Sequence, residues 1–283
     1  MLNVQTSSIK DAVQKEDHLK EILTTLRSVV VGFSGGVDSA YLAYVANRVL
    51  GKKALCVTAI SPSYPSFQRI ETAEFVTRYN LHHLEVETSE IENPRYRENS
   101  SNRCYYCKSE LFSKLKDLAQ LRGYDVVVDG TNYDDRKDFR PGRQAAKEYS
   151  VQSPLFEVQM TKLEIRELSR RSGLPTWDKP ALPCLSSRFP YGISISPEKL
   201  SVVDRGEEIL RDFGFKVFRV RYHESLVRLE FAPKELPKAL NVTMSAILNK
   251  QFKSLGFKFV TVDLEGYRSG SLNEVLPLHP SQD

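Results

Sequence analysis

The sequence predicts an α/β protein in which a doubly wound parallel sheet is followed by a smaller α+β domain. Over the first two thirds of the chain, short β-branched runs alternate with helical stretches, which is typical of a parallel sheet. After Ser196-Pro197 the order changes to helix, two strands, helix and strand. We therefore expect two domains, residues 1–192 and residues 193–283.

Composition places the chain among ordinary globular proteins. Of its 283 residues, 41% are hydrophobic and 27% are charged, and no apolar run approaches membrane-spanning length. Because the first residues contain no hydrophobic signal region, we expect a cytoplasmic enzyme with no membrane partner. The net charge of +4 is too mild to imply a nucleic-acid partner, and it leaves anionic small molecules as candidates.

The stretch Val29–Ser39 contains the main functional signal. Three valines and Phe33 predict a buried strand, Ser34-Gly35-Gly36 cannot continue it, and Asp38-Ser39 opens an apolar helical run. Glycines allow the backbone to turn sharply and approach a ligand, while the start of the helix favours an anion. The stretch therefore predicts a phosphate-binding loop.

The other elements follow from hydrophobic periodicity and turn residues. In the first domain we predict helices at residues 1–27, 65–79, 104–121 and 161–172, and further strands at residues 53–60, 83–86, 125–129 and 153–157. Thr161 and Glu164 have the spacing of a capping box. In the second domain we predict helices at residues 197–213 and up to 255, and strands at residues 217–222, 226–231 and 257–264.

A polar loop follows the predicted strand at residues 125–129. It carries Gly130, Thr131, Asn132, Asp134 and Asp135. Because the carboxyl ends of parallel strands share one edge, this loop is expected near the same nucleotide as the glycine loop, although a solvated turn would also explain it. Arg140 and Arg143, just beyond, are candidate anion clamps.

Three of the four cysteines stand in positions that suggest metal or redox use. Cys104 and Cys107 form a CxxC pair at the start of a predicted helix, where the helix dipole favours thiolates. Cys184 ends a proline-rich loop and is followed closely by Ser187 and Arg188. Cys56 lies inside an apolar strand and is expected to be an inert core residue.

Two further arginines alternate along a predicted strand of the second domain. Arg219 and Arg221 would share one face of that strand, where they could present two guanidiniums to an anionic ligand. A solvated sheet face is the ordinary alternative.

The glycine loop resembles that of a known class of enzymes. No Lys-Ser/Thr pair follows the glycines at Walker spacing, whereas Ser34-Gly35-Gly36-Val37-Asp38-Ser39 is similar to the SGGxDS loop of the PP-loop ATP pyrophosphatases. The resemblance implies a PP-loop (HUP-like) fold, ATP held by residues 34–39, Mg²⁺ on Asp38, and adenylation of a substrate.

Several motifs occurring in one order extend this resemblance to the LarE family. They are the glycine loop, GTNYDD and DFRPG, followed by Leu174–Pro180 and Cys184–Gly192. The resemblance implies an ATP-dependent sulfur insertase that converts the carboxylates of pyridinium-3,5-biscarboxylic acid mononucleotide to thiocarboxylates for the nickel-pincer cofactor of lactate racemase. It also implies a homo-oligomer, and it matches the family's sulfur-handling cysteine to Cys184, with Ser187 and Arg188 beside it. Arg140, Arg188, Arg219 and Arg221 become candidates for binding the nucleotide substrate.

The CxxC pair departs from family members that sacrifice a single cysteine in one turnover. Cys104, Cys107 and Cys184 could hold a [4Fe-4S] cluster with one iron open to carry sulfide. Zinc or a sacrificial Cys184 thiol are the alternatives. Rival functions are a PP-loop tRNA thiolase and a metal carrier that kept a nucleotide fold. The physiological sulfur donor cannot be identified from the sequence.

Overall fold

The computed structural model describes residues 2–137 and 141–268. The chain divides into two compact units, Met1–Tyr96 with Ser101–Leu182 and Arg97–Ser100 with Pro183–Asp283. The α/β class is confirmed. The domain boundary after residue 192 stays a prediction.

A parallel sheet forms the centre of the first unit. Among the described residues it has four strands in the order β3-β2-β1-β4. Their bounds are β1 (Val29–Gly32), β2 (Ala54–Ile60), β3 (His83–Glu87) and β4 (Val126–Val128). Val31 of β1 lies opposite Cys56 on one side and Val128 on the other. The inner position of β1 places the glycine loop near the middle of the sheet's carboxyl edge.

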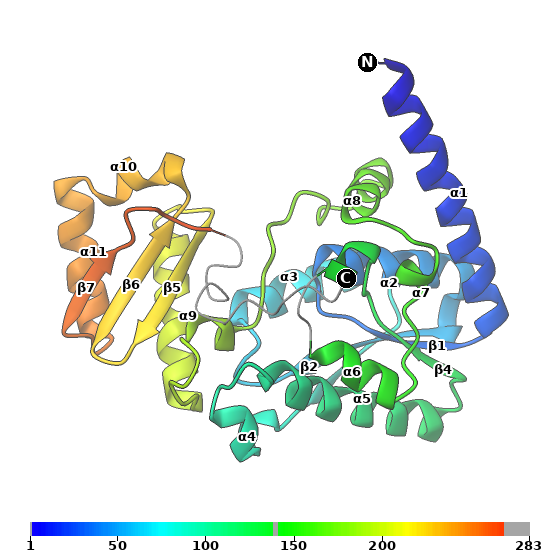
Figure 1. Cartoon of the computed structure of the whole chain (residues 1–283), viewed down its shortest axis with the longest axis horizontal. Coiled ribbons are helices and arrows are strands. Elements are labelled where there is room, and N and C mark those ends of the chain that lie inside the picture. Colours follow the sequence, from blue (N-terminus) through cyan, green and yellow to red (C-terminus); the bar gives the residue numbers. More distant parts are fainter. Residues whose placement is uncertain (1, 138–140, 269–283) are drawn as a thin grey trace. The chain divides into compact units, whose positions relative to one another are not determined.

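Helices cover both faces of this sheet, as the continuous apolar runs require. Val29 and Val31 pack in one core with α1 (Leu2–Leu26), α2 (Val37–Leu50), α3 (Ser66–Arg78) and α8 (Lys162–Arg171). Val30 points the other way, into a core with α5 (Arg103–Arg122) and α6 (Gly142–Glu148). Figure 1 shows α2 and α8 on one side of the strands and α5 and α6 on the other. The doubly wound arrangement is confirmed.

The predicted strand at residues 153–157 is wrong. Pro154–Glu157 forms the short helix α7, and pairing with the sheet is limited to a bridge between Gln152 and Val128. Proline has no N–H to donate to a ladder, while its fixed φ suits the first turn of a helix. The Ser153 carbonyl accepts the N–H groups of Phe156 and Glu157 at 2.9 and 3.0 Å, which closes that turn.

The connections of the first unit contain further short helical segments. They are η1 (Gly51–Lys53), η2 (Glu90–Glu92), α4 (Pro94–Arg97) and η3 (Tyr133–Lys137). None of the described helices combines the length and apolar content that a membrane span needs.

The second unit has the predicted order of helix, two strands, helix and strand. Its sheet, β5-β6-β7, pairs β5 (Phe218–His223) antiparallel with β6 (Leu226–Phe231) and β6 parallel with β7 (Phe259–Val262). The helices are α9 (Pro197–Asp212), α10 (Leu236–Ala239) and α11 (Val242–Ser254), with 3₁₀ turns η4 (Leu185–Arg188) and η5 (Pro233–Glu235).

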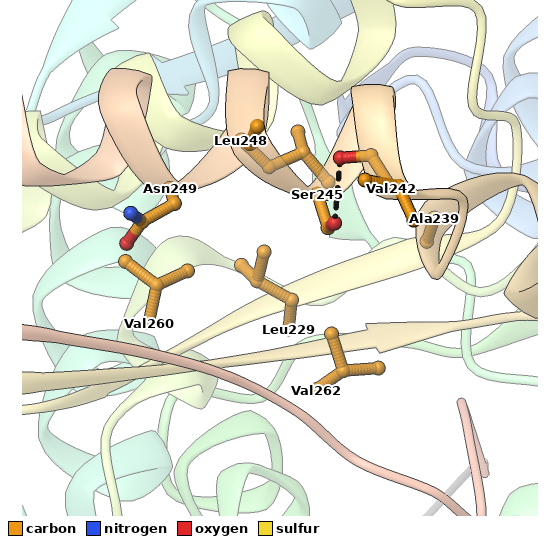
Figure 2. Close-up of a pocket in the computed structure, with 9 residues that line it drawn as sticks. Leu229, Ala239, Val242, Ser245, Leu248, Asn249, Val260 and Val262 are labelled. Carbon is orange, nitrogen blue, oxygen red and sulfur yellow. Dashed lines mark hydrogen bonds between the residues drawn. The ribbon is translucent and has the colours of Figure 1, made fainter.

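A hollow of about 370 Å³ opens in the second unit beside α11 and strands β6 and β7. Figure 2 shows Leu229, Val260 and Val262 from the sheet facing Leu248 and Asn249 from the helix. Its lining is mainly aliphatic and includes no residue predicted for the functional site. We therefore do not propose this hollow as the nucleotide-binding site.

Candidate active site

The glycine loop connects β1 to α2 and closes around the hydroxyl of Ser39. The Ser34 N–H donates to Ser39 Oγ at 3.2 Å, and that hydroxyl donates to the Gly36 carbonyl at 3.3 Å. Gly35 has a φ of +73°, which a residue with a side chain rarely adopts. These contacts hold the loop in a tight turn immediately before the N-terminus of α2, the arrangement that binds phosphate through backbone N–H groups.

Side chains from α3 and the loop before it support the glycine loop from outside. The Tyr64 hydroxyl and the Gln68 amide donate to the Ser34 carbonyl at 3.2 and 2.6 Å. Thr72 Oγ1 lies 2.8 Å from the Tyr64 oxygen. The turn is therefore preorganised before any ligand binds. Neither support is evident from the sequence, because each contact spans 30 or more residues.

The polar loop after β4 lies against the start of α2. A Cβ at Gly130 would come within 2.8 Å of the Ser39 backbone nitrogen, so only glycine permits this close approach. Asp129 fixes the loop by accepting the Thr131 N–H at 3.1 Å and the Ser153 hydroxyl at 2.7 Å. The structure thus brings Gly130 and Ser39 together, as the sheet topology predicts.

The remaining polar residues of this loop bond to one another. The Asn132 N–H donates to Asp135 Oδ2 at 3.1 Å, and the Asp134 N–H donates to Asn132 Oδ1 at 2.9 Å. Asp134 also accepts the Lys162 backbone N–H at 2.8 Å, which ties the start of α8 to this loop. These bonds account for the local turn, and direct contacts of the three side chains with ATP stay a prediction.

Asp38, in the first turn of α2, forms an ion pair with Lys162, a residue that the sequence did not indicate as functional. Lys162 Nζ donates to Asp38 Oδ2 at 2.5 Å. Asp38 Oδ1 is buried and has no hydrogen-bond partner among the described residues. A carboxylate oxygen left in this way suits Mg²⁺, which prefers oxygen ligands. Lys179 is a second missed cation, with its Nζ 2.9 Å from Glu71 and 3.5 Å from the Gly35 carbonyl.

The cysteines of the first unit occupy two different environments. Cys104, exposed, is the second residue of α5 and Cys107, half-buried, is the fifth, which confirms the predicted helix start. Cys56 is fully buried, and burial raises the pKa of its thiol to about 12, which confirms a neutral core residue. Cys184 is half-buried and belongs to the second unit. No three His, Cys, Asp or Glu side chains of the described chain are grouped to hold a metal ion, and the convergence of the three thiols stays a prediction.

Within the second unit, two guanidiniums hold the turn that follows Cys184. Arg188 pairs with Glu207 through two bonds of 2.8 and 2.9 Å, and its Nη1 donates to the Cys184 carbonyl at 3.0 Å. Arg221 pairs with Glu230 through two bonds of 2.9 Å and donates to the Ser187 carbonyl at 2.8 Å. These bonds fix the backbone on both sides of Ser187.

The pKa values of these buried side chains depend on the charges of their neighbours. Burial opposes ionisation of Arg188 and Glu207, but each partner's charge outweighs it, so the pKa of Arg188 is raised and that of Glu207 is lowered. Burial, and then the charge of Arg188, lower the pKa of Arg219 to about 10. Arg219 and Arg221 are 5% and 6% exposed, so the solvated-face alternative is wrong. Arg140 lies outside the described residues, and substrate contacts of all four arginines stay a prediction.

The sheet topology and the SGGVDS turn, with the Asp38 carboxylate within it, define a PP-loop ATP pyrophosphatase, a class that uses ATP.

A sequence profile of the NAD synthase family matches residues 3–114. The chain is 46% identical over 263 residues to an uncharacterized protein of Synechocystis, covering 93% of this chain and 98% of that one. It is 32% identical over 263 residues to the pyridinium-3,5-bisthiocarboxylic acid mononucleotide synthase of Lactiplantibacillus plantarum, covering 93% and 95%. An uncharacterized protein of Methanocaldococcus jannaschii is 32% identical over 261 residues, covering 92% and 98%. The chain therefore belongs to the LarE family, that of the L. plantarum synthase.

Proposed function

We propose that this protein is an ATP-dependent sulfurtransferase that adenylates the carboxylates of pyridinium-3,5-biscarboxylic acid mononucleotide and converts them to thiocarboxylates for nickel-pincer cofactor synthesis. The observation that carries the proposal is the similarity to the L. plantarum synthase over 93% of this chain, which includes both units. The preorganised glycine loop supports the ATP-dependent half of the reaction.

Adenylation solves the chemical problem of this substrate. A carboxylate resists nucleophilic attack because its leaving group would be oxide. A substrate carboxylate oxygen attacks the α-phosphorus of ATP, the bond to pyrophosphate breaks, and the acyl carbon gains AMP as a leaving group. The N–H groups of residues 34–39 would bind the phosphates, and Asp38 would hold Mg²⁺ through Oδ1, which has no hydrogen-bond partner in the part of the chain that the structure describes. When bound, Mg²⁺ neutralises the charge of the departing pyrophosphate.

The sulfur step is assigned to Cys184. A sulfide delivered there attacks the acyl carbon, the C–S bond of the thiocarboxylate forms, and the C–O bond to AMP breaks. Arg188 and Arg221 support this assignment, because they fix the turn that carries the thiol. We assign Arg188 a positioning role, since Glu207 and backbone carbonyls occupy its donors. Arg219 and Arg221 are proposed to face the anionic groups of the nucleotide substrate.

We further propose that Cys104 and Cys107 join Cys184 in holding a [4Fe-4S] cluster that carries the transferred sulfide. The donor set suits iron–sulfur chemistry, since a CxxC pair at the start of a helix presents two thiols at one helix end. A sacrificial Cys184, consumed in one turnover, is the alternative. Anaerobic purification with iron and sulfide analysis separates the two mechanisms.

The function is tested by incubating the anaerobically purified protein with ATP, Mg²⁺ and the biscarboxylated nucleotide. We expect AMP, pyrophosphate and a product heavier by the replacement of oxygen with sulfur. The matched control is the pyridinium nucleotide without its carboxylates, which should release no pyrophosphate. Incorporation of ammonia instead of sulfur would refute the assignment in favour of an amidating NAD synthase relative. Thiolation of tRNA, with no reaction of the nucleotide, would favour the tRNA thiolase.

A further inference from the structure

A buried carboxylate holds the turn that follows β2. Glu90, the first residue of η2, is 2% exposed, and its Oε1 accepts the Ser61 and Ser63 hydroxyls at 2.5 and 2.8 Å. No lysine or arginine of the described residues forms an ion pair with it, although glutamate is rarely buried without such a partner. We propose that Glu90 is a positioning residue for the ATP site, which shapes the glycine loop through this turn without touching the nucleotide. The proposal rests on the ATP site of the proposed function and adds an outer residue to it.

The two serine hydroxyls order the turn. The Tyr64 N–H donates to the Ser61 carbonyl at 3.0 Å, and Pro62 takes the second position, which its fixed φ suits. The Ser63 N–H donates to Ser61 Oγ at 3.2 Å. Each hydroxyl has one hydrogen and Glu90 accepts both, so the Ser61 oxygen presents a lone pair to that N–H. Loss of the carboxylate would leave both hydroxyls without this acceptor and free the Ser61 oxygen to rotate.

Tyr64 connects the turn to the glycine loop. Its N–H belongs to the turn, and its hydroxyl donates to the Ser34 carbonyl at 3.2 Å and lies 2.8 Å from Thr72 Oγ1. Burial raises the pKa of Tyr64 to about 12, so the hydroxyl keeps its hydrogen at neutral pH. Gln68 of α3 donates to the same carbonyl at 2.6 Å. Because Tyr64 is one of two supports, a disturbed turn should weaken the loop without abolishing its shape.

The Ser34 carbonyl determines where the next N–H of the loop points. A trans peptide directs its C=O and N–H in opposite directions, so holding this carbonyl from the α3 side places the Gly35 N–H on the other side of the loop. The Gly35 N–H has no hydrogen-bond partner among the described residues. It can therefore donate to a phosphate oxygen of ATP. Glu90 thus acts on phosphate affinity through the turn, Tyr64 and this peptide.

Removal of the carboxylate should weaken every ligand that presents phosphate to the loop. Glu90→Leu should bind MgATP and magnesium pyrophosphate about 3- to 10-fold more weakly, the loss expected when one hydrogen bond is misplaced. Glu90→Gln keeps a side-chain oxygen that can accept both hydroxyls, and it should bind both ligands within about twofold of the wild type. In the Tyr64→Phe background Glu90→Leu should have no further effect, because the hydroxyl through which the turn acts is already gone.

Calorimetric titrations of the full chain, without the pyridinium nucleotide, measure both affinities. Glu92→Leu is the matched control, because Glu92 belongs to the same short helix but is exposed, and both affinities should stay unchanged. Circular dichroism checks the fold of each variant. If Glu90→Leu does not fold, Ser63→Ala removes one of the two bonds to Glu90 and should give a smaller loss, again absent in the Tyr64→Phe background.

Three results would overturn the proposal. The first is wild-type affinity of Glu90→Leu for both ligands, and the second is a loss that simply adds to that of Tyr64→Phe. The third is weaker binding of MgATP with unchanged magnesium pyrophosphate, since Glu90 would then act on the nucleoside part of ATP. Failure of the wild type to bind MgATP would instead refute the ATP site of the proposed function itself.

Discussion

Gly35→Ala tests whether the shape of the glycine loop depends on its backbone alone or also on α3. The new methyl group would lie 2.3 Å from Thr72 Oγ1, well inside van der Waals contact. The φ of +73° costs an L-residue about 1–2 kcal/mol, and forcing apart a packed neighbour costs about 1–3 kcal/mol more. We expect the free energy of unfolding to fall by about 2–5 kcal/mol.

A double-mutant cycle separates the two contributions. Thr72→Ala removes the overlapping oxygen, so the cost of Gly35→Ala should fall by about 1–3 kcal/mol in that background while the backbone cost remains. Gly36→Ala is the matched control, because Gly36 has φ −75° and its nearest contact would be 3.5 Å. It should cost less than about 1 kcal/mol. Urea unfolding of the wild type, the two single mutants of the cycle, the double mutant and Gly36→Ala measures these costs. Equal costs of Gly35→Ala in both Thr72 backgrounds, no larger than that of Gly36→Ala, would refute the reasoning.

The remaining predictions concern the charge pairs and thiols. Asp38→Ala should abolish substrate-dependent pyrophosphate release with circular dichroism unchanged, and undiminished release would contradict its assignment. Glu207→Gln should destabilise the protein by about 3–5 kcal/mol, because it leaves Arg188 buried without its counter-charge. Since the pKa of Glu207 is lowered from 4.5, the wild-type advantage over this variant is complete above that pH and should shrink as the pH falls through the folded-state pKa. A pH-independent difference in urea midpoints would contradict this. Cys184→Ala should abolish sulfur transfer, whereas Cys56→Ala should leave it intact, and mass spectrometry of product and protein measures both.

Local signals were sufficient for much of the first unit. The glycine loop, its strand and its helix can be recognised from one contiguous stretch of sequence. The capping box can be recognised from two residues, Thr161 and Glu164, that stand three positions apart. The prediction of a strand at residues 153–157 is wrong because the missing N–H of Pro154, and not the apolar residues beside it, decides the local structure.

Contacts between distant segments could not be predicted in the same way. Lys162 lies at the start of a predicted helix, but its pairing with Asp38 depends on how two helices meet. The alternation of side chains along β5 places Arg219 and Arg221 on one face of the strand. Alternation alone does not show whether that face is exposed to solvent or buried. That distinction depends on carboxylates elsewhere, such as Glu230 on the neighbouring strand.

Residues 97–100 belong to the second unit, although the rest of that unit begins at residue 183. This arrangement affects how the second unit can fold during synthesis and how it can be expressed. Asn99 is fully buried in that unit, and its amide donates to the carbonyls of Phe189, Pro190 and Ile193 at 3.3, 2.7 and 3.0 Å. These acceptors follow Asn99 by 90 to 94 residues. At a synthesis rate of about 5–20 residues per second, Asn99 leaves the ribosome about 5–20 s before they do. A fragment beginning at residue 183 would lack it altogether, so expressing this unit by itself requires a fusion that joins residues 97–100 to the segment from residue 183 onward.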